Sequence, residues 1–332
     1  MKNQGKSIKI VSMGTYVPKV ITSTEIENRY GIPLGWAEKY SGVYKRHHVQ
    51  KETIGFMGAR AAEEALKNAN MDLDEIDMLI SAGGTHDYVI PNQASVIKEK
   101  MKNGKKFDFS AIDIDSTCLS FVAAMDFASR MLDGIQIRNI LIVSSEISSK
   151  GMDTTNWETM TLFGDGAAAA ILTFDENADS KYYKGMQKTY SEGTYHAMIE
   201  GGGNVNYFKD HPYDEKMYGF KMEGKKLLRL GKIKLPEFVD NFFNDLELSI
   251  TDIDCIIPHS ASKMALHVFQ DTYSFNENQM QDTLSTHGNC IAASIPLTLA
   301  KCIGNGRIKR GDTVYLLGTS AGFSIGGFLF KY

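Results

Sequence analysis

Cys118 is the residue of this chain whose type and position best suit covalent chemistry. It ends a strand-like run that begins at Phe109 and opens an apolar helical run from Leu119 to Leu132. The sequence therefore places its thiol at a helix N-terminus, where unpaired backbone N–H groups and the helix dipole favour a thiolate and can bind an oxyanion. The alternative is an inert cysteine, because free cysteine usually packs as a small hydrophobe.

Two polar residues in the second half of the chain could complete a site with Cys118. His259 follows the strand-like run 255–257, and Asn289 opens a helical run of small residues. Taken singly, each is more typical of a structural histidine or a turn residue. Because α/β folds collect their ligands at the ends of strands on one edge of a sheet, we expect these three side chains to converge.

Strand-like and helical runs alternate along the chain, which predicts a layered α/β fold. The polar stretch 175–220 is predicted to be a surface excursion. The second half repeats the order of elements in the first, so we predict two similar α/β halves, residues 1–175 and 176–332. The predicted strands cover residues 8–12, 77–82, 109–115, 139–145, 163–173, 218–223, 255–259, 279–283, 313–317 and 323–330; the predicted helices cover 53–68, 94–101, 119–132 and 225–246, and two more begin near 263 and 293.

Composition excludes several classes of protein. The 36 Lys and Arg against 40 Asp and Glu give a net charge of −4, so no general attraction to nucleic acid or to an anionic membrane is expected. The four cysteines are scattered, no apolar run approaches a membrane span, and the histidines lack zinc-binding spacing, which predicts a soluble cytoplasmic protein without a metal or cofactor. His47 and His48, beside Lys45 and Arg46, are predicted to form a solvated basic face.

Motifs spread over nearly the whole chain resemble the thiolase superfamily, specifically its β-ketoacyl-acyl carrier protein synthase III branch. The most specific are Phe-Gly-Asp-Gly-Ala at 163–167 and Gly-Asn-x-x-Ala-Ala-Ser-Ile-Pro at 288–296. The resemblance implies a five-layer αβαβα fold, a homodimer and Cys-His-Asn catalysis. Further matching stretches are 14–18, Trp36 with 41–42, 85–86, 116–118, 258–259 and 322–323.

In the mechanism that the resemblance implies, Cys118 takes an acyl group from an acyl thioester and condenses it with a malonyl-type thioester as carbon dioxide leaves. His259 and Asn289 would hydrogen-bond the thioester carbonyl of the extender and stabilise the enolate. Backbone N–H groups of Cys118 and Ala321 would form the oxyanion hole. The substrates would ride on coenzyme A or acyl carrier protein, and no resident cofactor is needed.

The chain departs from the family where substrate would enter. Tyr40 and Trp157 stand where the family commonly has arginines, and Ser262 stands where it has an asparagine. Aromatic rings can stack on adenine but cannot neutralise phosphate. Trp36, Trp157 and Ser262 are therefore predicted to bind substrate, with weak recognition of the phosphates of coenzyme A.

The stretch 85–91 lies where the family lets one subunit line the acyl pocket of its neighbour. Val89 and Ile90 are the candidates for that contact. Plain packing at the subunit interface is the alternative.

Two other functions remain open from the sequence. One is acyl transfer to an alcohol, amine or thiol without a new carbon–carbon bond, and the other is a non-catalytic subunit that pairs with an active relative. A hydroxymethylglutaryl-type condensation needs a carboxylate base, and no glutamate is clearly placed for it.

Overall fold

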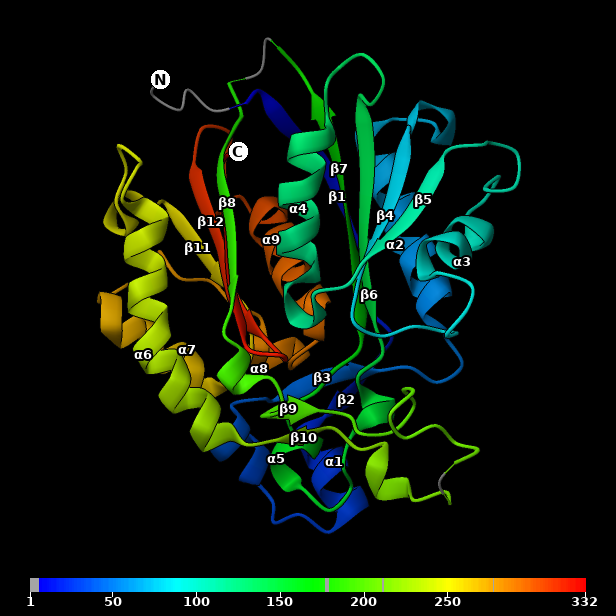
Figure 1. Ribbon diagram of the computed structural model, residues 1–332, viewed down its shortest axis with the longest axis vertical. Helices are drawn as coiled ribbons and strands as arrows, with labels where there is room; N and C mark the ends of the chain where they lie inside the picture. Colours follow the sequence, from blue (N-terminus) through cyan, green and yellow to red (C-terminus); the bar gives the residue numbers. More distant parts are fainter. Residues whose placement is uncertain (1–5, 177–178, 211, 277) are drawn as a thin grey trace.

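Two β-sheets, one from each half of the chain, form the framework of the molecule (Figure 1). The structure is a computed structural model and describes residues 6–176, 179–210, 212–276 and 278–332. In the first sheet the strand order is β1-β7-β6-β4-β5, with β7 antiparallel to both of its neighbours and β4 parallel to β5 and β6. Its strands are β1 (Ile8–Tyr16), β4 (Met78–Ala82), β5 (Ser110–Ile114), β6 (Asn139–Glu146) and β7 (Gly166–Phe174).

The second sheet repeats this topology in the order β11-β12-β13-β8. Strand β13 is antiparallel to both neighbours, and β11 is parallel to β12. At the free edge of β11, Met280 makes a parallel bridge to Ile256, in the place that β5 occupies in the first sheet. Of the predicted strand 279–283, only this bridge forms. The strands are β8 (Lys181–Thr189), β11 (Cys255–Pro258), β12 (Thr313–Ser320) and β13 (Ser324–Lys331).

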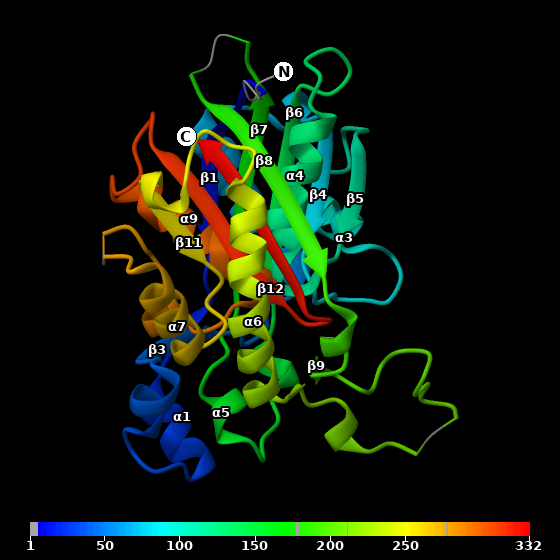
Figure 2. The same ribbon diagram turned by 60° about the vertical axis from the view of Figure 1, so that its left-hand side comes forward.

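Helices fill the space between the sheets and cover their outer faces, which confirms the predicted five-layer α/β fold (Figures 1 and 2). The central layer is α4 and α9, and its apolar side chains share one core with both sheets. The outer layers are α2 and α3 on the first sheet and α6 and α7 on the second. Their bounds are α2 (Ile54–Ala69), α3 (Gln93–Lys100), α4 (Ser120–Met131), α6 (Gly224–Phe243), α7 (Lys263–Tyr273) and α9 (Ser294–Gly304).

Small side chains allow these layers to approach closely. The run Ala167–Ala170 in β7 is wholly buried, and it packs against α2 on one face and α9 on the other. Thr53 precedes helix α2 and its side chain accepts a hydrogen bond from Phe56 N; the helix turns an alanine-rich face to β7. Thr53 is therefore the N-cap that the first turn of this helix requires.

The prediction that 175–220 is a surface excursion is wrong for its first part. Strand β8 runs through it and pairs with β13 along its whole length. The strand was missed because its sequence is rich in lysine and tyrosine. As an edge strand it holds the stems of these long side chains against the protein, and the amine of Lys184 reaches the carbonyl of Phe242 and the carboxylate of Asp245.

The predicted basic face at 45–48 is also wrong, because this stretch is strand β3 (Lys45–His48), which is buried except for Lys45 and is paired with β2 (Lys19–Thr22). Arg46 is fully buried and donates to Ser23 Oγ and Thr161 O. Burial lowers the pKa of its guanidinium to about 10. Both hydrogen bonds come from Nη2, whereas Nε and Nη1 are buried without a hydrogen-bond partner among the described residues.

The remaining short elements lie near this strand pair (Figure 1). No helix in the described ranges has the length and apolar character needed to cross a membrane. They are α1 (Ser23–Tyr30), α5 (Trp157–Met160), α8 (Leu284–His287), β9 (Ala197–Met198) and β10 (Lys221–Met222).

Candidate active site

The turn that carries Cys118 joins β5 to α4. Asp115 Oδ1 accepts a hydrogen bond from Thr117 N at 2.7 Å, and Ser116 N donates to Ser120 Oγ at 2.9 Å. Thr117 has a φ of +50°, a left-handed conformation that is unfavourable for a β-branched residue. A single 3-10 turn then runs into α4, so the partly buried Cys118 lies at the N-terminal end of this helix, as predicted.

The turn that carries Asn289 has the same construction in front of α9. Asn289 Oδ1 accepts from Ile291 N at 2.8 Å, and Cys290 N donates to Ser294 Oγ at 2.9 Å. Ile291 also has a φ of +50°. Because Oδ1 is engaged by a backbone N–H, the orientation of the amide is fixed, and its Nδ2 faces Ala261 O at 3.4 Å.

His259 follows β11 and donates its backbone N–H to Leu317 O at 2.8 Å. A Cβ on Gly318 would lie 2.8 Å from His259 Cβ and 3.1 Å from Leu119 Cδ2, so only glycine lets the histidine approach the residue after Cys118. Burial lowers the pKa of His259 to about 4, and the imidazole is neutral near pH 7. Its Nδ1 has no hydrogen-bond partner in the described part of the chain.

Two of the three turns meet beside Gly84. A Cβ at this position would lie 3.1 Å from Thr117 Cα and 3.7 Å from Ile291 Cγ2, so the turns before α4 and α9 approach each other here. Together with the contacts at Gly318 and Asn289, this gathers the predicted cysteine, histidine and asparagine around one site.

The helix N-terminus does not by itself make Cys118 a thiolate. Burial and the negative charges of Glu146 and Asp115 raise the pKa of the thiol to about 12. Hydrogen bonds from the backbone N–H groups of Ala321 and of Cys118 itself act in the opposite direction and do not prevail. The sequence-based expectation of a thiolate is therefore wrong for the free protein, although the two N–H groups predicted for the oxyanion hole do lie beside the sulfur.

Glu146, the last residue of β6, is a buried carboxyl that the sequence reasoning missed. One oxygen accepts from Gly84 N at 2.8 Å, and the other accepts from Thr85 N at 3.0 Å and from Thr85 Oγ1. The residue is entirely buried, and burial raises the pKa of its carboxyl to about 8. Its position at the end of a predicted strand was the available signal, since Cys118 and His259 were found in that way.

An aromatic cluster stands on one side of the site. Trp36 packs edge to face on Trp157, with ring centroids 6.0 Å apart, and lies 4.9 Å from Tyr40. Lys263, at the start of α7, donates to Lys39 O at 3.2 Å and so joins α7 to the same segment. The structure therefore brings together the two tryptophans that were predicted to bind substrate.

The other predicted binding residues are placed differently. Ser262 is the N-cap of α7, with its Oγ accepting from Ala265 N at 3.2 Å. Val89 and Ile90 lie on the loop between β4 and α3 and are 92% and 85% exposed. Within one chain these two side chains do not line the site.

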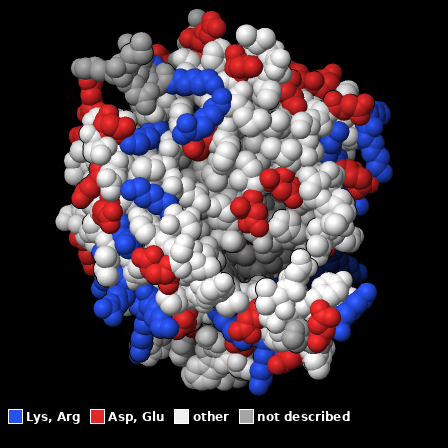
Figure 3. Space-filling view, in the orientation of Figure 1, with Lys and Arg blue, Asp and Glu red and all other residues white. Residues whose placement is uncertain are grey.

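The face shown in Figure 3 is hollowed near the lower end of α4, the end that follows Cys118. Acidic side chains lie at the upper rim of this hollow, and Asp115, two residues before the strained Thr117, is exposed. The hollow thus opens beside the turn that carries the thiol.

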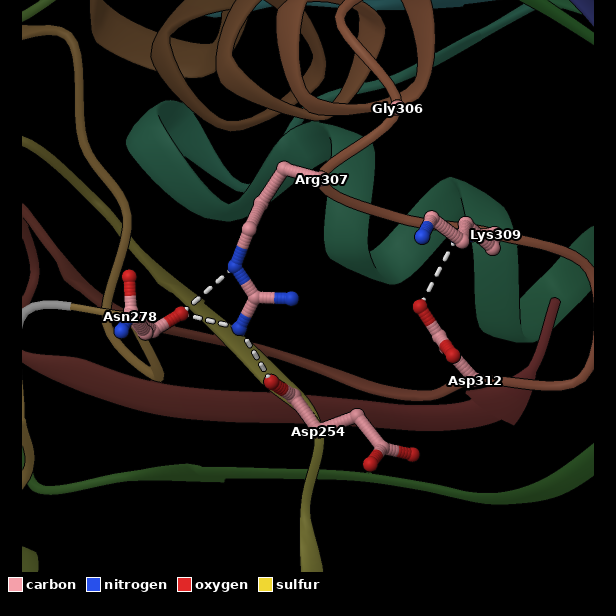
Figure 4. Close-up of a pocket in the computed structure, with 6 residues that line it drawn as sticks. All are labelled: Asp254, Asn278, Gly306, Arg307, Lys309 and Asp312. Atoms are coloured by element: carbon pink, nitrogen blue, oxygen red, sulfur yellow. Dashed lines mark hydrogen bonds between the residues drawn. The ribbon is translucent and has the colours of Figure 1, made fainter.

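A second, open pocket lies at the opposite ends of β11 and α9 from His259 and Asn289 (Figure 4). In it Arg307 donates to the carbonyls of Asn278 and Asp254, which ties two loops together. Its lining residues are Asp254, Asn278, Gly306, Arg307, Lys309 and Asp312. We assign this pocket a structural role.

Comparisons with known proteins agree with this arrangement. The family described as 3-Oxoacyl-[acyl-carrier-protein (ACP)] synthase III matches residues 112–189, and its C-terminal counterpart matches residues 243–332. The beta-ketoacyl-[acyl-carrier-protein] synthases III of Paramagnetospirillum magneticum and Vesicomyosocius okutanii are 29% and 28% identical; the matches cover 97% and 98% of this chain and 98% and 99% of those proteins.

Solved structures show the same fold. The 3-oxoacyl-[acyl-carrier-protein] synthase III of Aquifex aeolicus superposes with a TM-score of 0.86 at 25% identity, covering 98% of this chain and all of that one. The priming beta-ketosynthase of the R1128 polyketide pathway superposes with a TM-score of 0.87 at 21% identity, covering 98% and 96% of the two chains.

Proposed function

Because the chain belongs to the 3-oxoacyl-acyl carrier protein synthase III family of the thiolase superfamily, we propose that it joins an acyl thioester to a malonyl thioester by decarboxylating Claisen condensation. The product is a 3-oxoacyl thioester for fatty-acid or specialised acyl metabolism. The observation that carries the proposal is the convergence of Cys118, His259 and Asn289 at one site.

In the first half-reaction Cys118 Sγ attacks the carbonyl carbon of the acyl thioester. The resting thiol is protonated, so its proton leaves as the carbon–sulfur bond forms and is taken up by the departing carrier thiol. The backbone N–H groups of Ala321 and Cys118 stabilise the oxyanion of the tetrahedral intermediate. The result is an acyl–enzyme and a free carrier thiol.

In the second half-reaction the malonyl thioester loses carbon dioxide, and the electron pair is held as an enolate. Asn289 Nδ2 and the imidazole N–H of His259 hydrogen-bond the enolate oxygen. Asn289 suits this role because Ile291 N fixes its oxygen and leaves Nδ2 as the donor. The enolate carbon attacks the acyl–enzyme, and Cys118 leaves as a thiolate that takes a proton from water to restore the resting thiol.

The aromatic cluster of Trp36, Tyr40 and Trp157 is the proposed entrance for the carrier arm of acyl-CoA or acyl carrier protein. These rings offer stacking surfaces, and Trp157 is 41% exposed. Ser262 lies at the head of α7 on the same side, where its hydroxyl can contact the pantetheine chain. The reaction as written requires no resident cofactor.

We further propose a homodimer in the cytoplasm. Strand β5 is paired on one side only within the described residues, and Val89 and Ile90 present large apolar surfaces to solvent. A second copy would cover both and would place these two side chains at the acyl pocket of its partner. The four free thiols accord with a reducing compartment.

Mass spectrometry tests the function directly. The purified protein is incubated with acyl-CoA of several chain lengths, and an acyl adduct on Cys118 is expected; malonyl thioester should then discharge it with release of carbon dioxide. Cys118→Ala is the matched control. Transfer of the acyl group to an alcohol or amine without carbon dioxide would favour simple acyl transfer, and no adduct at any chain length would refute the proposal.

A further inference from the structure

Among the described residues, Glu146 is the one buried carboxyl at this site to which the proposed reaction gives no role. All three of its hydrogen bonds go to the turn after β4, at Gly84 and Thr85. It is entirely buried, and such a group is retained only where its hydrogen bonds or its charge serve the surrounding structure.

The turn that Glu146 holds is wedged between the carboxyl and the residue before Cys118. A Cβ on Gly83 would lie 3.2 Å from Glu146 Oε1, and one on Gly84 would lie 3.1 Å from Thr117 Cα. A side chain at either glycine would require a neighbouring atom to shift by a few tenths of an ångström. The backbone of these two glycines therefore lies between the Glu146 carboxyl and the strained Thr117.

We propose that Glu146 is a positioning residue that clamps the turn 83–85 against Thr117 and, through its own ionisation, controls the pH at which Cys118 becomes nucleophilic. The inference deepens the proposed function, because it concerns the nucleophile of the same site. Glu146 need not touch the substrate, since it acts through the field at the sulfur and through the position of the turn.

The charged and polar groups around the sulfur determine whether ionisation of Glu146 raises or lowers the pKa of Cys118. Glu146 and the exposed Asp115 oppose the thiolate, His259 is neutral near pH 7, and the N–H groups of Cys118 and Ala321 favour the thiolate. Below pH 8 Glu146 is mostly protonated and exerts little opposition. As the pH rises through 8, the new carboxylate makes further ionisation of the thiol harder.

The rate at which iodoacetamide alkylates Cys118 measures the effect of Glu146 ionisation on the thiol, and it needs no acyl substrate. Far below the pKa of the thiol, the logarithm of the rate rises with pH at a slope of one. For the native protein we expect the slope to fall below one around pH 8, as Glu146 ionises, and to recover above it. Because Cys255, Cys290 and Cys302 are buried, Cys118→Ala gives the background rate.

Glu146→Gln removes the charge and should give a slope of one throughout. It should match the native rate below pH 7 and exceed it by about tenfold above pH 9. A structural role alone would change the rate at every pH and leave the shape of the profile unchanged. Acylation of Cys118 by acyl-CoA is scored separately, so a failed condensation and a failed role for Glu146 give different results.

Thr85→Val is the second variant, since glutamine places an NH₂ group against a backbone donor and can prevent folding. It removes the hydroxyl that lowers the pKa of Glu146 and should move the bend in the profile to higher pH, whereas Thr85→Ser should leave it in place. A native profile with a constant slope of one from pH 6 to 10 would overturn the proposal, as would a bend that persists in Glu146→Gln.

Discussion

The turn before α4 and the turn before α9 have the same backbone construction and opposite chemistry. In each, a side-chain oxygen accepts the N–H two residues ahead, a residue at φ +50° follows, and a 3-10 turn leads into the helix. Asp115 of the first turn corresponds to Asn289 of the second, and Cys118 corresponds to Ala292. The two halves of the molecule thus contain the same type of turn, but the reactive residue is at a different position in each: Cys118 in the first and Asn289 in the second.

The difference between Asp115 and Asn289 lies in the side-chain atom that does not cap the turn. Both supply the oxygen that caps the turn, but the second oxygen of Asp115 is a charged acceptor exposed to solvent, and the nitrogen of Asn289 is an N–H donor inside the site. In each side chain one atom therefore stabilises the turn, and the chemistry of the site depends on the other atom. Three predictions test whether the two turns can be exchanged, and a fourth concerns the ends of the parallel strands.

The largest effect is expected from moving the thiol between the turns. Cys118→Ala should abolish the acyl adduct, and adding Ala292→Cys should not restore it, because Ala292 is entirely buried beneath the second turn. Intact-mass measurement after incubation with acyl-CoA checks both variants. An adduct on residue 292 would show that the turns are interchangeable and that burial does not distinguish them.

Asn289→Asp converts the second turn into the first. The oxygen that caps Ile291 is retained, so the fold should persist, but the donor to the enolate is replaced by a negative charge. We expect decarboxylation to fall by about 10²- to 10³-fold, with acylation of Cys118 far less affected. Carbon dioxide release and adduct formation are measured in parallel; an equal loss in both would place Asn289 in the first half-reaction as well.

The ends of the parallel strands differ as the turns do, since β4 is followed by Gly83 and Gly84 and β11 is followed by His259. Burial lowers the pKa of His259 to about 4, so the unfolded chain, with an ordinary histidine pKa, binds the proton first as the pH falls. This contribution to the free energy of unfolding is complete above pH 6.5 and is lost as the pH falls to 4. The loss amounts to about 3 kcal/mol at most. In His259→Gln, the free energy of unfolding measured by urea denaturation should depend less on pH over that range than in the native protein. An unchanged pH dependence would contradict the lowered pKa of His259.

The sequence was sufficient to predict those parts of the site that follow from element order. Cys118, His259 and Asn289 each stand at a junction between elements, and a layered fold with repeated halves brings such junctions together. Strand β8 escaped prediction because an edge strand needs only half-buried side chains, so lysine and tyrosine satisfy it. Arg46 escaped because its burial depends on Ser23 and Thr161, which are distant in the chain.

The acidity of Cys118 was mispredicted for a related reason. The helix N-terminus is visible in the sequence, but the opposing carboxylate of Glu146 arrives from another strand, and burial is a property of the whole fold. Local sequence thus indicated where the nucleophile lies, and long-range contacts decide when it ionises.

The smallest effect is expected from Asp115→Asn, which converts the first turn into the second. Asparagine keeps the oxygen that accepts from Thr117 N, so the turn and the stability of the protein should be preserved. The charge of Asp115 raises the pKa of Cys118 less than that of Glu146 does, and Asp115 is exposed, so we expect alkylation at pH 8 to increase by only about two- to threefold. Raising the salt concentration should produce part of the same increase in the native protein and none in the variant. If the variant instead reacts more slowly, the carboxylate assists the thiol, and the two turns differ in a way that charge alone does not describe.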